Sequence, residues 1–125
     1  MAKQIIVTTL IFLALVGAGL AEIFVVNNHF TALEEQLVAA YEKAENKTLT
    51  EQEYDIIWDD WKNRRECVEY FLNHLDFTEM DFRMAECHAY VAQQDFDSAQ
   101  AQLDVLIELS RHIPHMLIPT PEHIL

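Results

Sequence analysis

Two cysteines are the side chains in this sequence that could form a covalent cross-link. Cys67 and Cys87 lie on segments that we expect to be neighbouring helices, and a turn at residues 76–77 would bring them level. An oxidising exterior would then permit a disulfide. The alternative is two ordinary buried thiols. Helix axes lie about 8–10 Å apart, whereas a disulfide needs Cα atoms nearer than about 7 Å.

Histidines near the C-terminus are candidate metal ligands. They are His112, His115 and His123, with Glu122 beside the last of them. Imidazole and carboxylate groups bind zinc, and a tail that folds back could bring them together. Their spacing matches no strong metal-binding motif, so incidental histidines are the favoured interpretation, and we expect neither a metal nor a cofactor. His88 has the pattern of a boundary or core position, and we expect it to be a hydrogen-bonded core residue and not a metal ligand.

No arrangement typical of an enzyme is visible in the sequence. It contains no nucleophile elbow, no glycine-rich phosphate loop and no paired-cysteine motif. Asp59 and Asp60 lie between Trp58 and Trp61, but adjacent positions on a helix point about 100° apart, so the two carboxylates do not converge. We therefore predict a protein that is not an enzyme, with the tryptophans in the core and at the rim of a helical bundle.

The elements that must position these residues begin with an apolar run over residues 5–26. Its only polar residues are Thr8, Thr9 and Glu22. As a helix the run is roughly 33 Å long, and the hydrocarbon core of a bilayer is about 30 Å thick. Glu22 lies about one turn from the far end, where a carboxyl group can reach the headgroups. We predict a transmembrane anchor over residues 1–26.

A cleaved signal peptide is the main alternative to an anchor. Lys3 supplies a positive flank, and residues 19–21 offer small side chains for cleavage. Against cleavage, the apolar run continues to Val26 and is longer than usual for a signal. A buried helix of a soluble protein is a third interpretation. After Lys3, no Lys or Arg follows until Lys43, so the positive-inside rule predicts a single-pass cell-membrane protein with a cytoplasmic N-terminus.

The remainder of the chain has the pattern of helices. Neither Gly nor Pro occurs between Asn27 and Val105, which excludes the frequent turns of β structure and predicts an all-α fold. An apolar stripe with three- and four-residue spacing continues from Val26, so the first helix should extend to about Asn46.

Capping signals indicate where the later helices begin. Thr50 with Glu53 forms a capping box for a second helix, which we expect to end near residue 77. Thr78 with Asp81 predicts the cap of a third, and Asp95 that of a fourth. Pro114 should end the fourth helix, which leaves a proline-rich tail over residues 114–125.

Short loops between these helices predict an antiparallel bundle of three to four helices over residues 27–113. The pair from residue 78 to 112 has the size of one tetratricopeptide-like hairpin, although a single copy is weak evidence for a repeat fold. One stripe of residues should form either the core or an interaction face: Trp58, Trp61, Phe71, Leu103 and Leu106.

The charge beyond the apolar run is strongly negative. After Val26 there are 20 acidic residues against 7 Lys and Arg, which gives −13. Such a surface repels phosphate backbones, so nucleic-acid binding is excluded. A solvated surface is the simplest explanation, and a docking face for a basic partner is the alternative.

Three segments together resemble the domain-of-unknown-function 4363 family of small bacterial membrane proteins. They are "WDDWKNRRECVEYFLNHLD", "AECHAYVAQQDFDSAQAQLDVL" and the ending "RHIPHMLIPTPEHIL", which follow the N-terminal span. The most specific parts are the turn at residues 112–114 and the closing residues 122–125. The resemblance implies a single-span helical protein and no established activity.

These observations predict a membrane-anchored, non-enzymatic interaction module on the outer side of a bacterial membrane. Its partner should be another membrane or envelope protein, or a second copy of the chain. Two alternatives stay open. One is a metal-binding or metal-sensing envelope protein that uses the tail histidines, and the other is an accessory subunit of a membrane enzyme or transporter.

Overall fold

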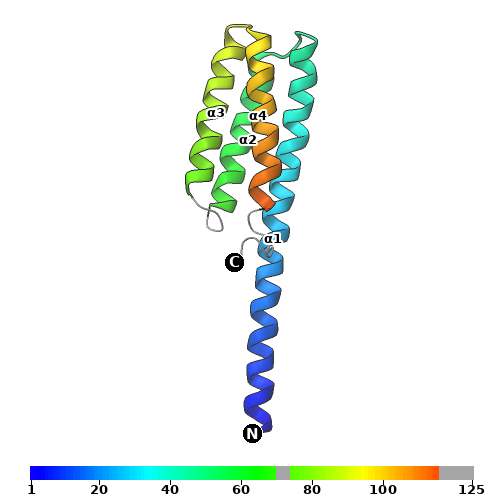
Figure 1. Cartoon of the computed structure of the whole chain (residues 1–125), viewed down its shortest axis with the longest axis vertical. Coiled ribbons are helices and arrows are strands. Elements are labelled where there is room, and N and C mark those ends of the chain that lie inside the picture. Colours follow the sequence, from blue (N-terminus) through cyan, green and yellow to red (C-terminus); the bar gives the residue numbers. More distant parts are fainter. Residues whose placement is uncertain (70–73, 116–125) are drawn as a thin grey trace.

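The computed structural model describes residues 1–69 and 74–115, which form four α-helices and no strand. The helices are α1 (Ala2–Glu45), α2 (Glu51–Val68), α3 (His74–Ala92) and α4 (Phe96–His115) (Figure 1). The predicted all-α fold is confirmed.

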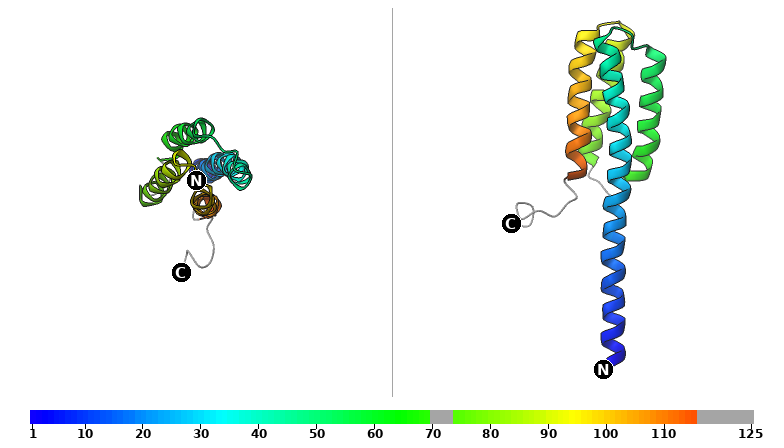
Figure 2. Two further views of the ribbon diagram at one scale, coloured as in Figure 1. Left: turned by 90° about the horizontal axis from the view of Figure 1, so that it is seen from above. Right: turned by 90° about the vertical axis from the view of Figure 1, so that its right-hand side faces the viewer.

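The four helices run alternately up and down around a common core. α1 and α3 each pack against both α2 and α4, so the bundle is a closed square in which sequence neighbours are also neighbours in space (Figure 2). The α1–α2 and α3–α4 connections lie at the end away from the N-terminus, and α4 ends beside the middle of α1. The N-terminal half of α1 therefore projects from the bundle as a stalk.

α1 joins the stalk to the bundle without a break. The large apolar side chains of the stalk are exposed, among them Phe12 and Leu15 at 64% and 68%. Val26 is the first buried residue of α1, and further buried positions follow at three- and four-residue steps to Ala44. α1 is long and apolar enough to cross a membrane. The predicted continuation of the apolar stripe into the bundle is confirmed.

Side-chain caps begin α2 and α4 where the sequence predicts them. The Glu53 backbone N–H donates to Thr50 Oγ1 at 3.1 Å, and the Thr50 N–H donates to Glu53 Oε1 at 3.3 Å. Lys43 adds an ion pair from α1 to Glu53. At α4, the Ser98 N–H donates to Asp95 Oδ1 at 3.3 Å. These caps satisfy N–H groups that have no partner within the helix.

The predicted start of the third helix is wrong. α3 begins at His74, so Thr78 lies one turn inside the helix and does not cap it. Asp81 bonds to α2 instead of closing a capping box. α4 also runs one residue beyond Pro114, to His115. Pro114 lacks the N–H that would bond to the carbonyl oxygen four residues earlier. Because the helix ends one residue later, no further turn is lost.

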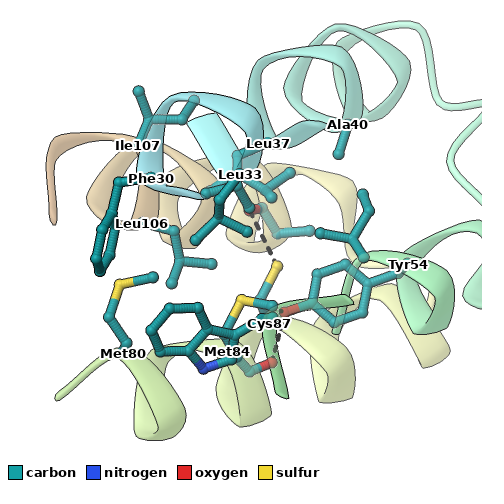
Figure 3. Close-up of a cluster of buried hydrophobic side chains, with 14 of the residues drawn as sticks. Phe30, Leu33, Leu37, Ala40, Tyr54, Met80, Met84, Cys87, Leu106 and Ile107 are labelled. Atoms are coloured by element: carbon teal, nitrogen blue, oxygen red, sulfur yellow. Dashed lines mark hydrogen bonds between the residues drawn. The ribbon is translucent and has the colours of Figure 1, made fainter. Parts of the chain in front are cut away.

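Side chains from all four helices meet in the core (Figure 3). Phe30, Leu33 and Leu37 of α1 face Leu106 and Ile107 of α4. Three sulfur-bearing side chains of α3 lie below them and are fully buried: Met80, Met84 and Cys87. The apolar stripe of α1 is thus exposed along the stalk and buried where the other three helices surround it.

Candidate functional site

A polar seam fixes α2 against α3. Trp61 is 1% exposed, and its Nε1–H donates to Asp81 Oδ1 at 2.9 Å. Arg65 pairs with the other oxygen of Asp81, and its guanidinium lies 5.8 Å from the centre of the Phe77 ring. Higher along the seam, the Tyr54 hydroxyl donates to the Met84 carbonyl oxygen at 2.6 Å. These contacts set the register of the two helices.

That register excludes the disulfide that the sequence left open as one of two possibilities. Trp61 lies level with Asp81 and Arg65 with Phe77, so Cys67 lies level with about position 75. Cys87 is about 12 residues further along α3, which is roughly 18 Å at 1.5 Å per residue. Both cysteines are free, Cys67 is exposed and Cys87 is buried. The register assumed from the sequence differs from the observed one by about eleven positions along α3, and this difference accounts for the expectation that the two cysteines would lie level.

Cys87 is an unreactive thiol within the core. Its Sγ donates to the Ala99 carbonyl oxygen of α4 at 3.8 Å. Burial raises the pKa of Cys87 to about 12, because the desolvated thiolate is disfavoured. Burial also raises the pKa of Tyr54, so both groups stay protonated at neutral pH.

A cluster of one histidine and two acids, here called the His88 cluster, lies on the distal half of α2 and α3. His88 Nε2 is 3.0 Å from Asp55 Oδ1 and 3.4 Å from Glu51 Oε1. The His88 ring lies 5.1 Å from the Trp58 ring and 6.0 Å from the Tyr54 ring, measured between centres. Its side chain is 29% exposed. His88 therefore lies at the rim of the bundle, where its ring packs against aromatic rings. This is the boundary position that the sequence allowed, and the favoured core position is wrong.

A shallow groove of about 250 Å³ lies between α1 and α2 near their connection. Ile56 stands at its edge with 68% of its surface exposed. Gln36 also lines the groove, and its Oε1 is buried without a hydrogen-bond partner. Lys43 and Glu53 complete the polar part of its wall, and apolar side chains form the rest: Ala39, Ala40, Leu49 and Ile57.

A second hollow, of about 550 Å³, lies at the stalk end of the same two helices. Arg64 of α2 donates from Nη1 to His29 Nδ1 of α1 at 3.0 Å and from Nε to Asp60 at 2.6 Å. Arginine can only donate, so this contact is a hydrogen bond in the His29 tautomer whose lone pair is on Nδ1. The Arg64–His29 contact beside this hollow therefore connects α1 and α2 at the base of the bundle.

The candidate residues named from the sequence lie in different parts of the structure. Trp61, Leu103 and Leu106 are buried in the core, Trp58 is half-buried, and Phe71 lies outside the described residues. For the predicted tail site, His112 is exposed near the end of α4. His115 ends that helix, and His123 and Glu122 lie outside the described residues, so the metal site suggested there is not assembled by the described part of the chain.

Neither the His88 cluster nor the groove was predicted from the sequence. Glu51 and Asp55 have the four-residue spacing that places two side chains on one helix face. The sequence could therefore have indicated this pair of acids. Their contact with His88 depends on the α2–α3 register, which was predicted incorrectly.

The architecture is that of a four-helix bundle carried on a long apolar helix. A family model described as "Domain of unknown function (DUF4363)" matches residues 20–124, and the chain belongs to this family. The resemblance noted in the sequence is thereby confirmed. Searches of curated proteins and of solved structures found no match to this chain.

Proposed function

We propose that this chain is a membrane-anchored, non-enzymatic interaction module, held on the outer side of a bacterial membrane. The anchor is supported by the continuous α1, whose exposed apolar stalk has the length of a span. The outward orientation is supported by Lys3 before the span and by the lack of any Lys or Arg in the sequence after it until Lys43.

One observation carries the interaction role: the groove between α1 and α2 combines an exposed apolar edge with an unused acceptor. Ile56 is 68% exposed, and Gln36 Oε1 is buried without a partner. A buried acceptor without a partner costs about 1–3 kcal/mol. A binding segment that places an apolar side chain beside Ile56 would cover that exposed side chain. If the Gln36 side chain rotates toward the groove, the same segment can donate a hydrogen bond to Gln36 Oε1, which is buried in the observed rotamer.

Charge indicates the kind of partner that this groove fits. The chain beyond Val26 carries −13, so its field attracts a basic protein surface and speeds the encounter with it. The same field repels a second copy of the bundle, which weighs against self-association. We therefore expect a basic segment of another membrane or envelope protein. An accessory-subunit role is the case in which that protein is an enzyme or transporter.

Site-specific photo-crosslinking in native membranes tests this function. A photoreactive residue in place of Ile56 should give one discrete adduct, and the same residue at the exposed Ala101 of α4 should give none. Raising the salt concentration should weaken the adduct, because screening reduces the attraction between exposed charges. The cross-linked peptide of the partner should be basic.

Two results would contradict the proposal. Equal adducts from positions 56 and 101 would show non-specific proximity, and an acidic or self-derived peptide at position 56 would refute the charge argument. Replacing Ile56 by Lys should abolish the adduct formed from a photoreactive residue at the exposed groove position Ala39, while Ala101→Lys should leave it intact.

A further inference from the structure

We propose that the His88 cluster (Glu51, Asp55 and His88) binds a divalent first-row cation of the zinc type. The ligand atoms are Glu51 Oε1, Asp55 Oδ1 and His88 Nε2, which all lie within 4.8 Å of one another. One imidazole nitrogen with two carboxylate oxygens is a borderline donor set, suited to zinc and its neighbours more than to calcium or magnesium. This site is separate from the tail histidines and from the α1–α2 groove.

The distances within the cluster match the edges of a zinc coordination shell. With bonds of about 2.0–2.1 Å and tetrahedral angles, two ligand atoms on one zinc ion lie roughly 3.3 Å apart. The two distances from His88 Nε2, 3.0 Å and 3.4 Å, bracket that value. The flexible Glu51 side chain is 52% exposed and can adjust the remaining edge.

Charge balance favours a cation over a hydrogen bond alone. Two carboxylates face one ring nitrogen, which has a single N–H to donate. In the described part of the chain, the ion pairs of Glu51 and Asp55 are to His88, with no lysine or arginine within 4.0 Å. A divalent ion would neutralise both carboxylates together and use the nitrogen lone pair of neutral His88.

The surroundings hold the His88 ring and the backbone of Glu51 and Asp55 in place. Glu51 and Asp55 are one turn apart at the start of α2, where the Thr50 capping box fixes the backbone. The rings of Trp58 and Tyr54 pack against His88 and limit its rotation. The cluster is partly exposed, so a bound ion would keep at least one coordination position for water or a ligand from a partner.

Zinc titration of the full-length chain in lipid nanodiscs, after treatment with a chelator, tests the proposal. We expect one equivalent of Zn²⁺ to bind to the wild type and to raise the melting temperature. His88→Gln and Asp55→Asn should each weaken binding at least about tenfold, while Glu45→Gln, at an exposed acid on α1, should change it less than about twofold. Co²⁺ should give the visible absorption of a site with one nitrogen ligand.

Each remaining outcome decides the question. Unchanged zinc affinity in His88→Gln, or no binding to the wild type, overturns the proposal and leaves a hydrogen-bonded cluster. Loss of binding in a variant with His112, His115 and His123 replaced by Ala would assign the ion to the tail and also overturn it. Unfolding of the apo variants is checked by their melting temperature without zinc. Crosslinking at position 56 is independent of this result, so failure of one proposal does not imply failure of the other.

Discussion

Replacing Trp61 by Ala should destabilise the bundle severely. Its indole is 1% exposed, and its ring centre lies 5.8 Å from that of Phe30 and 6.0 Å from that of Phe77. Removing such a side chain from a packed core costs about 3–5 kcal/mol. The lost bond to Asp81 adds little beyond this range, because Asp81 keeps its pair with Arg65 and is 31% exposed. A domain of this size has about 5–15 kcal/mol of stability in total.

The buried Cys87 provides the assay. Its thiol reacts only when the bundle opens, so the labelling rate reports the open population when closing is faster than labelling. A loss of about 3–5 kcal/mol corresponds to labelling roughly 10²- to 10⁴-fold faster, at 1.4 kcal/mol for each factor of ten. The exposed Cys67 is replaced by Ser beforehand to leave one reporter.

Two further variants separate packing from hydrogen bonding. Trp61→Phe keeps most of the apolar contact and loses the bond to Asp81, so Cys87 labelling should accelerate by about tenfold, for a loss near 1.5 kcal/mol. Trp58→Ala removes the same ring from a half-buried position and should have a smaller effect than Trp61→Ala. Labelling of Trp61→Ala at the wild-type rate would refute the assignment of Trp61 to the core.

Four other outcomes are expected. A membrane-impermeant thiol reagent added to spheroplasts should label Cys67 and spare Cys87; protection of Cys67 there would reverse the proposed orientation. Carbonate washing should leave the full-length chain in the membrane pellet, whereas a soluble chain that starts at Glu22 would indicate cleavage. Thr50→Ala should lower the free energy of unfolding by about 1 kcal/mol in urea titrations, and Thr50→Ser should restore it. Because Lys43 and Thr50 lower the pKa of Glu53 below its ordinary 4.5, the stabilisation from Glu53 should be present above that pH and lost as the pH falls through the lowered pKa.

Features encoded by neighbouring residues were predictable from the sequence. The stripe from Val26 to Ala44 follows the helical period, and the cap at Thr50 needs only the residue three positions later. Both depend on contacts within one helix or one turn, so no knowledge of the packing was required.

Features that depend on the register between helices were not predictable. Thr78 and Asp81 have the spacing of a capping box, yet Asp81 bonds to Trp61 and Arg65 of α2, and α3 begins one turn earlier at His74. Tertiary contacts outweighed the local signal. The observed register separates Cys67 from Cys87 and brings His88 to Asp55, and neither relation can be read from the pattern of one helix alone.

Because α1 is unbroken, a tilt of its apolar half would move the whole bundle. In the anchored arrangement proposed above, the part of α1 within the bundle, residues 26–45, is about 30 Å long at 1.5 Å per residue. Transmembrane helices tilt by about 20° on average, and a tilt of that size would carry the far end sideways by about 10 Å. The α1–α2 connection and the His88 cluster lie toward that end. A change in membrane thickness that alters the tilt of α1 would therefore displace the end of the bundle furthest from the lipid.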